Sequence, residues 1–248
     1  MKLNGIDVSR WQGKVDWQKI KATGKVDFAI IRAGYGRVAT QKDTQFENNY
    51  KGAKAAGIPI GAYWYSYATT TVQAKQEALA CLQVIQGKQF EYPIWFDQEY
   101  EKGIVALDNA TRTAICKAFC DELEKAGYYT GIYCSSDWMN TRLNYKELSA
   151  YDHWAAHYGK ECTSKHEYGI WQYSSTNALK IPGYLRSLDC NYCYKNYPAI
   201  IKGAGLNGYK KESAKRYTGT IKAVKAVDKK ILDDEAKALG ITIQWKEE

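Results

Sequence analysis

The 248-residue sequence predicts an α/β protein that folds as a closed but irregular β/α barrel and carries a small α+β extension at its C-terminus. Up to about residue 200, short apolar and β-branched runs alternate with amphipathic helical segments, as parallel strands alternate with crossover helices. The later strand-like runs follow one another with few helical signals between them. Because no glycine-rich phosphate loop follows the first run, the sequence disfavours an open nucleotide-binding sheet.

Eight segments have the length and the β-branched or aromatic content of strands. They are Gly5–Ser9, Phe28–Gly34, Pro59–Tyr67, Tyr92–Phe96, Thr130–Cys134, His153–His157, Gly169–Tyr173 and Ser187–Asn191. Amphipathic helices are expected between the early strands, at Phe46–Ala56, Thr71–Ile85 and Asn109–Ala126. A glycine follows each helix closely, and glycine is the residue that most often ends a helix.

Polar side chains stand at the ends of these strands, where a β/α barrel collects its functional groups. Asp7 closes the first expected strand, Asp97 and Glu99 follow the fourth, and Asp189 closes the eighth. The first and eighth strands are neighbours in a closed barrel, so carboxyl groups are expected to gather at one mouth. The remaining polar residues at strand ends are Arg32, Tyr35, Tyr63, Tyr65, Tyr133, Tyr158, Trp171 and Gln172. For each tyrosine or tryptophan, simple packing at the rim is the alternative to ligand binding.

The strongest local signal is the pair Asp97 and Glu99, which follows the apolar run Ile94–Phe96. Residues two apart on a strand share a face, so both carboxyl groups point the same way. Two like charges this close do not both ionise cheaply, and one carboxyl should have a raised pKa. Glycoside hydrolysis needs this division between an acid and a carboxylate. A solvated turn is the alternative, because a single Asp-x-Glu occurs often by chance.

The run Gly5-Ile6-Asp7-Val8-Ser9-Arg10-Trp11-Gln12-Gly13 resembles the opening of glycoside hydrolase family 25. This family includes the Chalaropsis-type lysozymes and many phage endolysins. The resemblance continues in the same order through 28–36, 61–68, 97–99, 131–133, 171–175 and 188–191. It therefore spans residues 4 to about 200, which makes it far more specific than any one of these motifs.

The resemblance implies a modified TIM-like (β/α)5(β)3 barrel that cleaves the β-1,4 bond between N-acetylmuramic acid and N-acetylglucosamine in Gram-positive peptidoglycan. By position, Glu99 corresponds to the general acid/base, and Asp97 to a nucleophile or to the group that orients the substrate's N-acetyl arm. Asp7 and Asp189 match the family's other two active-site aspartates. A retaining outcome is expected, with the glycan groove lined by Tyr35, Tyr63, Tyr65, Tyr133, Tyr158, Trp171 and Gln172.

Two other functions remain open at this point. The first is a barrel that binds glycans without cleaving them, although the complete set of carboxyl groups argues against it. The second is a chitinase-like glycosidase, but chitinases usually show a longer Asp-x-x-Asp-x-Asp-x-Glu run. The residues before Asp97 are instead apolar or aromatic.

Charge and residue content limit the classes of partner, cofactor and covalent cross-link that are expected. A net charge of +8 favours acidic partners such as anionic wall polymers, and no nucleic-acid motif or apolar membrane span is visible. The seven cysteines are an odd number in a long chain, which predicts free thiols rather than a disulfide framework. The three histidines form neither a metal pattern nor a catalytic triad, so no metal and no cofactor is expected. Arg32 is expected to form a structural ion pair.

The predicted organisation is a catalytic barrel over residues 1–202, a glycine-rich linker over 203–208 and a small segment over 209–248. The last segment begins with a lysine-rich stretch, and a strand at Thr218–Val227 and a helix at Asp228–Leu239 are expected within it. It is too small to hold a good core alone, so wall binding or oligomerisation is its expected role. Because the strand motif begins almost at Met1, no signal peptide is expected. This predicts a phage or prophage lysin, made in the host cytoplasm and acting on the wall after release.

Overall fold

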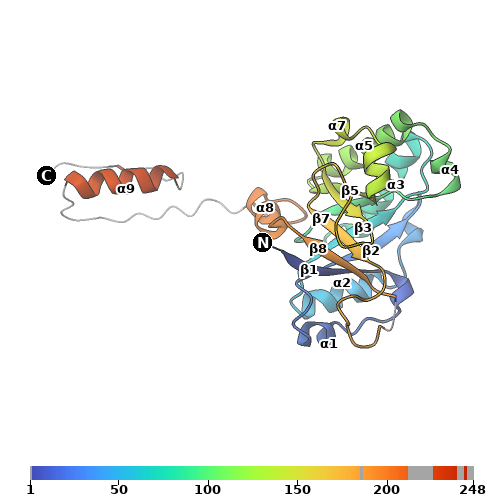
Figure 1. Ribbon diagram of the computed structural model, residues 1–248, viewed down its shortest axis with the longest axis horizontal. Coiled ribbons are helices and arrows are strands. Elements are labelled where there is room, and N and C mark those ends of the chain that lie inside the picture. The colour runs from blue at the N-terminus through green and yellow to red at the C-terminus, as the bar shows by residue number, and fades with distance from the viewer. Residues whose placement is uncertain (1, 185–186, 212–225, 239–242, 245–248) are drawn as a thin grey trace. The chain divides into compact units, whose positions relative to one another are not determined.

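The computed structural model describes residues 2–184, 187–211, 226–238 and 243–244 (Figure 1). The chain divides into two compact units, Met1–Glu212 and Ser213–Glu248, which are described separately below. None of the helices within these described ranges is long and apolar enough to cross a membrane.

The first unit is a closed barrel in which the strand order follows the chain from β1 to β8. The strands are β1 (Leu3–Val8), β2 (Phe28–Tyr35), β3 (Ile60–Tyr65), β4 (Ile94–Asp97), β5 (Thr130–Ser135), β6 (Asp152–Ala156), β7 (Ile170–Ser174) and β8 (Asp189–Cys193). Strands β1 to β7 run parallel, whereas β8 is antiparallel to both of its neighbours, β1 and β7. The predicted barrel is therefore confirmed.

Helices follow the first five strands, as the (β/α)5(β)3 pattern implies. In chain order they are η1 (Arg10–Gln12), α1 (Trp17–Ala22), η2 (Ala39–Gln41), α2 (Phe46–Ala55), α3 (Thr71–Ile85), α4 (Lys102–Val105), α5 (Asn109–Lys125), α6 (Ser136–Thr141) and α7 (Tyr145–Leu148). Several of these helices are capped by the side chain of the residue just before the helix. Thr70 accepts a hydrogen bond from the Gln73 amide at α3, and Asp108 accepts one from the Thr111 amide at α5. In the described ranges, no helix separates β6 from β7 or β7 from β8.

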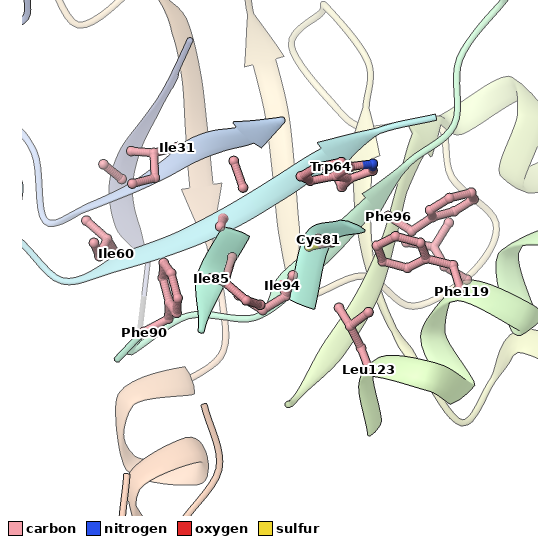
Figure 2. Packing of buried hydrophobic residues seen from close by; sticks show 14 of the residues in the cluster. Ile31, Ile60, Trp64, Cys81, Ile85, Phe90, Ile94, Phe96, Phe119 and Leu123 are labelled. Atoms are coloured by element: carbon pink, nitrogen blue, oxygen red, sulfur yellow. The ribbon is translucent and has the colours of Figure 1, made fainter. Parts of the chain in front are cut away.

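Alternation along each strand sorts the core into an inner and an outer layer. On β4, Phe96 faces the helices and packs on Phe119 of α5, with ring centroids 4.6 Å apart (Figure 2). Its neighbour Trp95 belongs to the inner cluster and meets Trp154 of β6 at 5.7 Å. Asp97 lies on the same inward face as Trp95, one step nearer the mouth. This alternation places a carboxyl group at the top of an aromatic barrel core.

The opposite end of the barrel is closed by helix α8 (Tyr197–Ala204) and the turn after it. Tyr197 is buried against Trp95 and Tyr92, and the fully buried Asn207 binds backbone groups just before two strands. Its Oδ1 accepts from the Tyr129 amide at 2.7 Å, and its Nδ2 donates to the Tyr92 carbonyl at 2.9 Å. The predicted linker at 203–208 is therefore wrong, since this segment belongs to the first unit. In the sequence the glycines of this segment suggest flexibility. In the structure they supply left-handed backbone positions, as Gly205 does with φ of 70°.

The second unit contains helix α9 (Ala226–Ala238), which confirms most of the helix expected at Asp228–Leu239. The strand expected at Thr218–Val227 falls outside the described residues except for its last two positions, and those belong to α9. The lysine-rich stretch that begins this segment also lies largely outside the described residues.

Candidate active site

Four carboxyl groups line one pocket of about 150 Å³ at the mouth of the barrel. Asp7 lies near the end of β1, Asp97 ends β4, and Glu99 follows two residues later. Asp189 begins β8 rather than closing it, so the predicted place of this residue in its strand is wrong. Because β8 is antiparallel, its first residue is the one that reaches the mouth, opposite Asp7. The other lining residues are Tyr63, Tyr133, Trp154, Tyr158 and Gln172.

Asp7 is held by two side-chain amides. Its Oδ2 accepts from Gln172 Nε2 at 3.0 Å and from Asn191 Nδ2 at 2.7 Å. Gln172 Oε1 accepts in turn from the hydroxyls of Tyr133 at 2.9 Å and Tyr158 at 3.0 Å. Since the amide oxygen is occupied by these hydroxyls, the amide nitrogen is directed at Asp7. This network fixes Asp7 in the orientation that its charged form favours.

Burial raises the pKa of every carboxyl group in the pocket, and repulsion by neighbouring carboxylates adds to this effect at Asp7, Asp97 and Glu99. The pKa of Asp97 lies well above its usual value because the group is buried and faces the charges of Glu99 and Asp7. Burial also raises the pKa of Glu99, and a hydrogen bond with Asp97 works in the opposite direction. Burial raises the pKa of Asp189 to about 6, and burial together with the Asp189 charge raises that of Asp7. Each carboxyl group in the pocket therefore holds its proton more strongly than it would in water, as a general acid requires.

One atom in the pocket lacks a protein partner. Asp97 Oδ1 is buried and has no hydrogen-bond partner among the described residues. A buried polar atom without a partner is costly, and in a native structure it indicates a functional role or a bound water. The structure thus carries an uncompensated buried oxygen at Asp97.

A second and larger pocket, of about 320 Å³, adjoins the first. The two pockets share Glu99, Tyr133 and Tyr158, so Glu99 stands where they meet. The further lining residues are Tyr100, Ser135, Ser136, Asp137, Ala156 and His157. Sequence reasoning missed most of this pocket. Ser135 ends β5, and Ser136 and Asp137 directly follow it, so the strand-end rule that selected Tyr133 could have found them too.

The sequence profile of glycosyl hydrolases family 25 matches residues 6–183, a span that contains Asp7, Asp97 and Glu99. The chain belongs to glycosyl hydrolase family 25. Among curated proteins, it is similar to YegX from Escherichia coli K12, with 30% identity over 161 residues that cover 63% of this chain and 56% of YegX. It is equally similar to the autolytic lysozyme of Clostridium acetobutylicum, with 30% identity over 63% of this chain and 45% of that protein. The chain spans about half the length of these relatives.

Solved structures agree with this membership of family 25. The autolysin LytC of Streptococcus pneumoniae shares 27% identity at a TM-score of 0.69, covering 78% of this chain and 47% of LytC. The CTP1L endolysin shares 27% identity at the same TM-score, covering 81% of this chain and 70% of the endolysin. A lysozyme of Streptomyces coelicolor, at 24% identity and a TM-score of 0.69, covers 82% of this chain and 98% of its own and supports the fold alone.

The structure of this family 25 hydrolase brings together most of the residues predicted for the site. The four carboxyl groups and Tyr63, Tyr133, Tyr158 and Gln172 share one pocket. Tyr35 and Tyr65 lie in register at the ends of β2 and β3, but they line neither pocket. Arg32 forms the expected structural pair, with its Nε donating to Asp43 Oδ2 at 2.6 Å.

Trp171 does not lie where a groove residue was expected. It precedes Gln172 on β7, and adjacent side chains on a strand point to opposite faces. Because Gln172 faces the barrel interior, Trp171 turns away, where its ring packs on Tyr192 and its Nε1 donates to the His157 carbonyl at 2.7 Å. The expected substrate contact by Trp171 is therefore wrong for this arrangement.

The structure of this family 25 hydrolase also shows the state of its cysteines and whether metal-ligating side chains come together. All seven cysteines are free, as their number predicted. Among the residues that the structure describes, no group of three His, Cys, Asp or Glu side chains could hold a metal ion.

Proposed function

We propose that the protein is a muramidase that hydrolyses the β-1,4 bond between N-acetylmuramic acid and N-acetylglucosamine in peptidoglycan. The observation that carries this proposal is the convergence of four carboxyl groups with raised pKa values on one pocket walled by aromatic and amide side chains. Membership of family 25 supports the reaction class. Relatives described as an autolytic lysozyme and as an autolysin bound to a synthetic peptidoglycan ligand support the substrate.

Glu99 is the proposed general acid and base. Among the carboxyl groups that line these pockets, Glu99 is the one that lines both, whereas Asp97 lines only the inner one, so Glu99 is the carboxyl group that can meet an oxygen joining sugars on the two sides. The raised pKa values of both groups keep a proton within the pair. Delivery of this proton by Glu99 to the glycosidic oxygen leaves Asp97 ionised beside the positive charge that develops at the anomeric carbon. Glu99 then accepts a proton from the attacking water.

Asp97 has two possible roles in this scheme, and both retain the anomeric configuration. It attacks the anomeric carbon as a nucleophile, or it orients the substrate's own N-acetyl group for that attack. Asp97 lines the inner pocket and has one buried oxygen without a partner, a cost in stability that supports a functional role of either kind. Asp7 and Asp189 complete the proposed machinery by setting the charge around the pair.

Two adjoining pockets suit cleavage inside a polymer. A chain that crosses Glu99 would place one sugar in the inner pocket with Tyr63 and Trp154, and the next beside Tyr100 and His157. Cleavage would then occur between these sugars, within a strand rather than at its end.

The biological setting is part of the proposal. A structural neighbour described as an endolysin supports a lysin of a phage or prophage that acts on Gram-positive walls after release from the host cytoplasm. The net charge of +8 suits binding to anionic wall polymers through residues 209–248, and oligomerisation through α9 is the other proposed role of this segment.

The deciding experiment is analysis of the products released from purified Gram-positive walls by mass spectrometry. The protein should release muropeptides with new muramic acid reducing ends, and Glu99→Gln should reduce that release by about a thousandfold while the protein stays folded. Glu124→Gln is the matched control, because Glu124 lies on α5 and lines neither pocket. Free peptides would overturn the proposal, and faster cleavage of chitin oligomers than of peptidoglycan would favour a chitinase. Wall binding without any cleavage would favour a non-catalytic barrel.

A further inference from the structure

An exposed tryptophan lies at the mouth of the barrel, outside both pockets. Trp11 sits in η1, directly after β1, and 73% of its surface is accessible to solvent. The turn that carries it is well defined, since Ser9 accepts a hydrogen bond from the Trp11 amide and the Gln12 side chain binds back to the Ser9 amide. A single exposed aromatic side chain is common, but a patch of adjoining aromatic side chains indicates a binding surface.

Arginine and tyrosine side chains extend this surface towards the active site. The guanidinium of Arg10 lies 4.8 Å from the Trp11 ring and 5.7 Å from the ring of Tyr35. Tyr35 then meets Tyr67, which is half-exposed, at 6.3 Å edge to face. We name this surface the arginine–aromatic platform, made of Arg10, Trp11, Tyr35 and Tyr67.

The platform is continuous with the catalytic pair. Tyr67 packs on Tyr65 with ring centroids 5.2 Å apart, and Tyr65 is in register with Asp97 across β3 and β4. The Tyr65 hydroxyl donates to Glu101 at 2.7 Å, in the segment that carries Glu99. The platform thus approaches the catalytic pair from the side of β1 to β3, whereas the larger pocket is lined from β5 and β6.

Charge indicates what the platform binds. The pocket itself is lined by carboxyl groups, so it repels an anionic substituent on the substrate. Arg10 is exposed, and within the described part of the chain no carboxylate pairs with its guanidinium. Asp43, which binds the Arg10 backbone amide, pairs instead with Arg32. The guanidinium lies within cation–π distance of both rings and has N–H groups available for a carboxylate, while the rings offer apolar faces to a sugar.

From these contacts we infer that the arginine–aromatic platform binds a carboxylate-bearing sugar unit of the wall strand, beyond the units held in the two pockets. The inference rests on the proposed function for the identity of the strand. Two groups supply such a carboxylate in peptidoglycan: the lactyl group of a muramic acid without its peptide, and the stem peptide itself. Both would direct their charge to Arg10.

The test compares a polymeric glycan strand with a disaccharide that fills only the two pockets and does not reach the platform. Trp11→Ala should lower kcat/KM on the polymer by about three- to tenfold and leave the disaccharide unaffected. Tyr194→Ala is the matched control, since Tyr194 is also an exposed aromatic but follows β8 at the opposite end of the barrel. Equal losses on both substrates, or an equal effect of Tyr194→Ala, would overturn the inference.

A second series tests the carboxylate. Arg10→Gln should lower kcat/KM on native strands, but not on strands whose carboxylates have been converted to neutral amides. Arg142→Gln removes the same charge from an exposed arginine outside both pockets. It should leave kcat/KM unchanged on native strands and on amidated strands. An amidase that strips the stem peptides frees the lactyl carboxylate of each muramic acid, so a lost Arg10 effect on stripped strands identifies the stem as the source, and a retained one shows that the lactyl carboxylate is bound. An Arg10 effect that survives amidation would contradict the inference.

Failure of the proposed function can be told apart from failure of this inference. If the unmodified protein cleaves neither substrate, the muramidase proposal fails, whatever the variants do. Co-sedimentation of the unmodified protein and Trp11→Ala with insoluble walls then tests the platform without cleavage. Weaker sedimentation of Trp11→Ala, with Tyr194→Ala unchanged, supports the platform, and equal sedimentation of all three overturns it.

Discussion

Asp7 and Asp189 stand opposite each other in the antiparallel pairing of β1 with β8. Each group is buried enough that its pKa is raised, that of Asp189 to about 6. The unfolded chain releases the Asp189 proton near pH 4, whereas the folded protein retains it up to about pH 6. Between these values the folded state binds more protons, so the free energy of unfolding falls as pH rises.

We therefore predict that Asp189→Asn removes part of this pH dependence. Stability of the variant should fall less than that of the unmodified protein between pH 4 and pH 6, because the amide does not titrate. Thermal unfolding across this range measures the effect. Parallel curves for the two proteins would show that Asp189 has an ordinary pKa in the folded state.

A second prediction concerns Gln172, which donates one of the two amide hydrogen bonds to Asp7. Gln172→Met keeps a similar side-chain shape but removes this donor, so the pKa of Asp7 should rise further. If catalysis needs the ionised form of Asp7, the acid limb of the pH–rate profile should move to higher pH. Hydrolysis rates measured from pH 4 to pH 8 report this movement. A profile lowered equally at every pH would show that Gln172 acts through shape alone.

The third prediction concerns Glu77, a buried carboxyl on α3 that supports the turn after β3. It accepts from the Ser66 hydroxyl at 2.7 Å and from the Tyr67 amide at 2.9 Å, and burial raises its pKa to about 7. Since this pKa exceeds the unfolded value of about 4.3, the Glu77 contribution to stability should fall as pH rises between the two. Glu77→Gln should flatten this fall and change stability at pH 5 by less than about 1 kcal/mol, because the protonated carboxyl and the amide both offer one donor and one acceptor. Urea unfolding at pH 5 and pH 8 measures both effects. If the change in stability between the two pH values is the same for the variant and the unmodified protein, the raised pKa of Glu77 is refuted.

The fourth prediction tests the closure of the barrel by the turn after α8. Asn207→Ala removes two buried hydrogen bonds and leaves the Tyr129 amide and Tyr92 carbonyl without partners. We expect a loss of about 2–4 kcal/mol in the free energy of unfolding. Asn48→Ala, at an exposed asparagine on α2, is the matched control and should change stability by less than about 0.5 kcal/mol. Equal stabilities for the two variants would show that the turn does not hold the barrel closed.

The barrel could be predicted because the sequence patterns that indicate its strands and helices are local. The alternation of side chains on strands and the spacing of apolar residues on helices depend only on neighbouring residues. The shared face of Asp97 and Glu99 follows from the same alternation. The expectation that Asp7 and Asp189 lie near this pair needed only the closure of the barrel and the rule that polar groups collect at its mouth.

The errors arose where orientation depends on distant partners. The direction of β8 is set by its pairing with β1 and β7, so Asp189 was placed at the wrong end of its strand. Trp171 was assigned to the mouth because it is aromatic, although its neighbour Gln172 already occupied the inward position. The glycines at 203–208 indicate a linker, but the segment is packed. The local pattern does not reveal this, because Asn207 makes its buried contacts with residues far earlier in the chain.

The antiparallel β8 also has a consequence for synthesis on the ribosome. Because β8 hydrogen-bonds to both β1 and β7, the barrel cannot close until residues up to Cys193 have left the exit tunnel. Until then the first strand keeps an unpaired edge, which is a template for association with other chains. Pairing between the two ends of so long a segment is also slow. A nascent chain of this protein is therefore most exposed to aggregation just before the last strand of the barrel emerges.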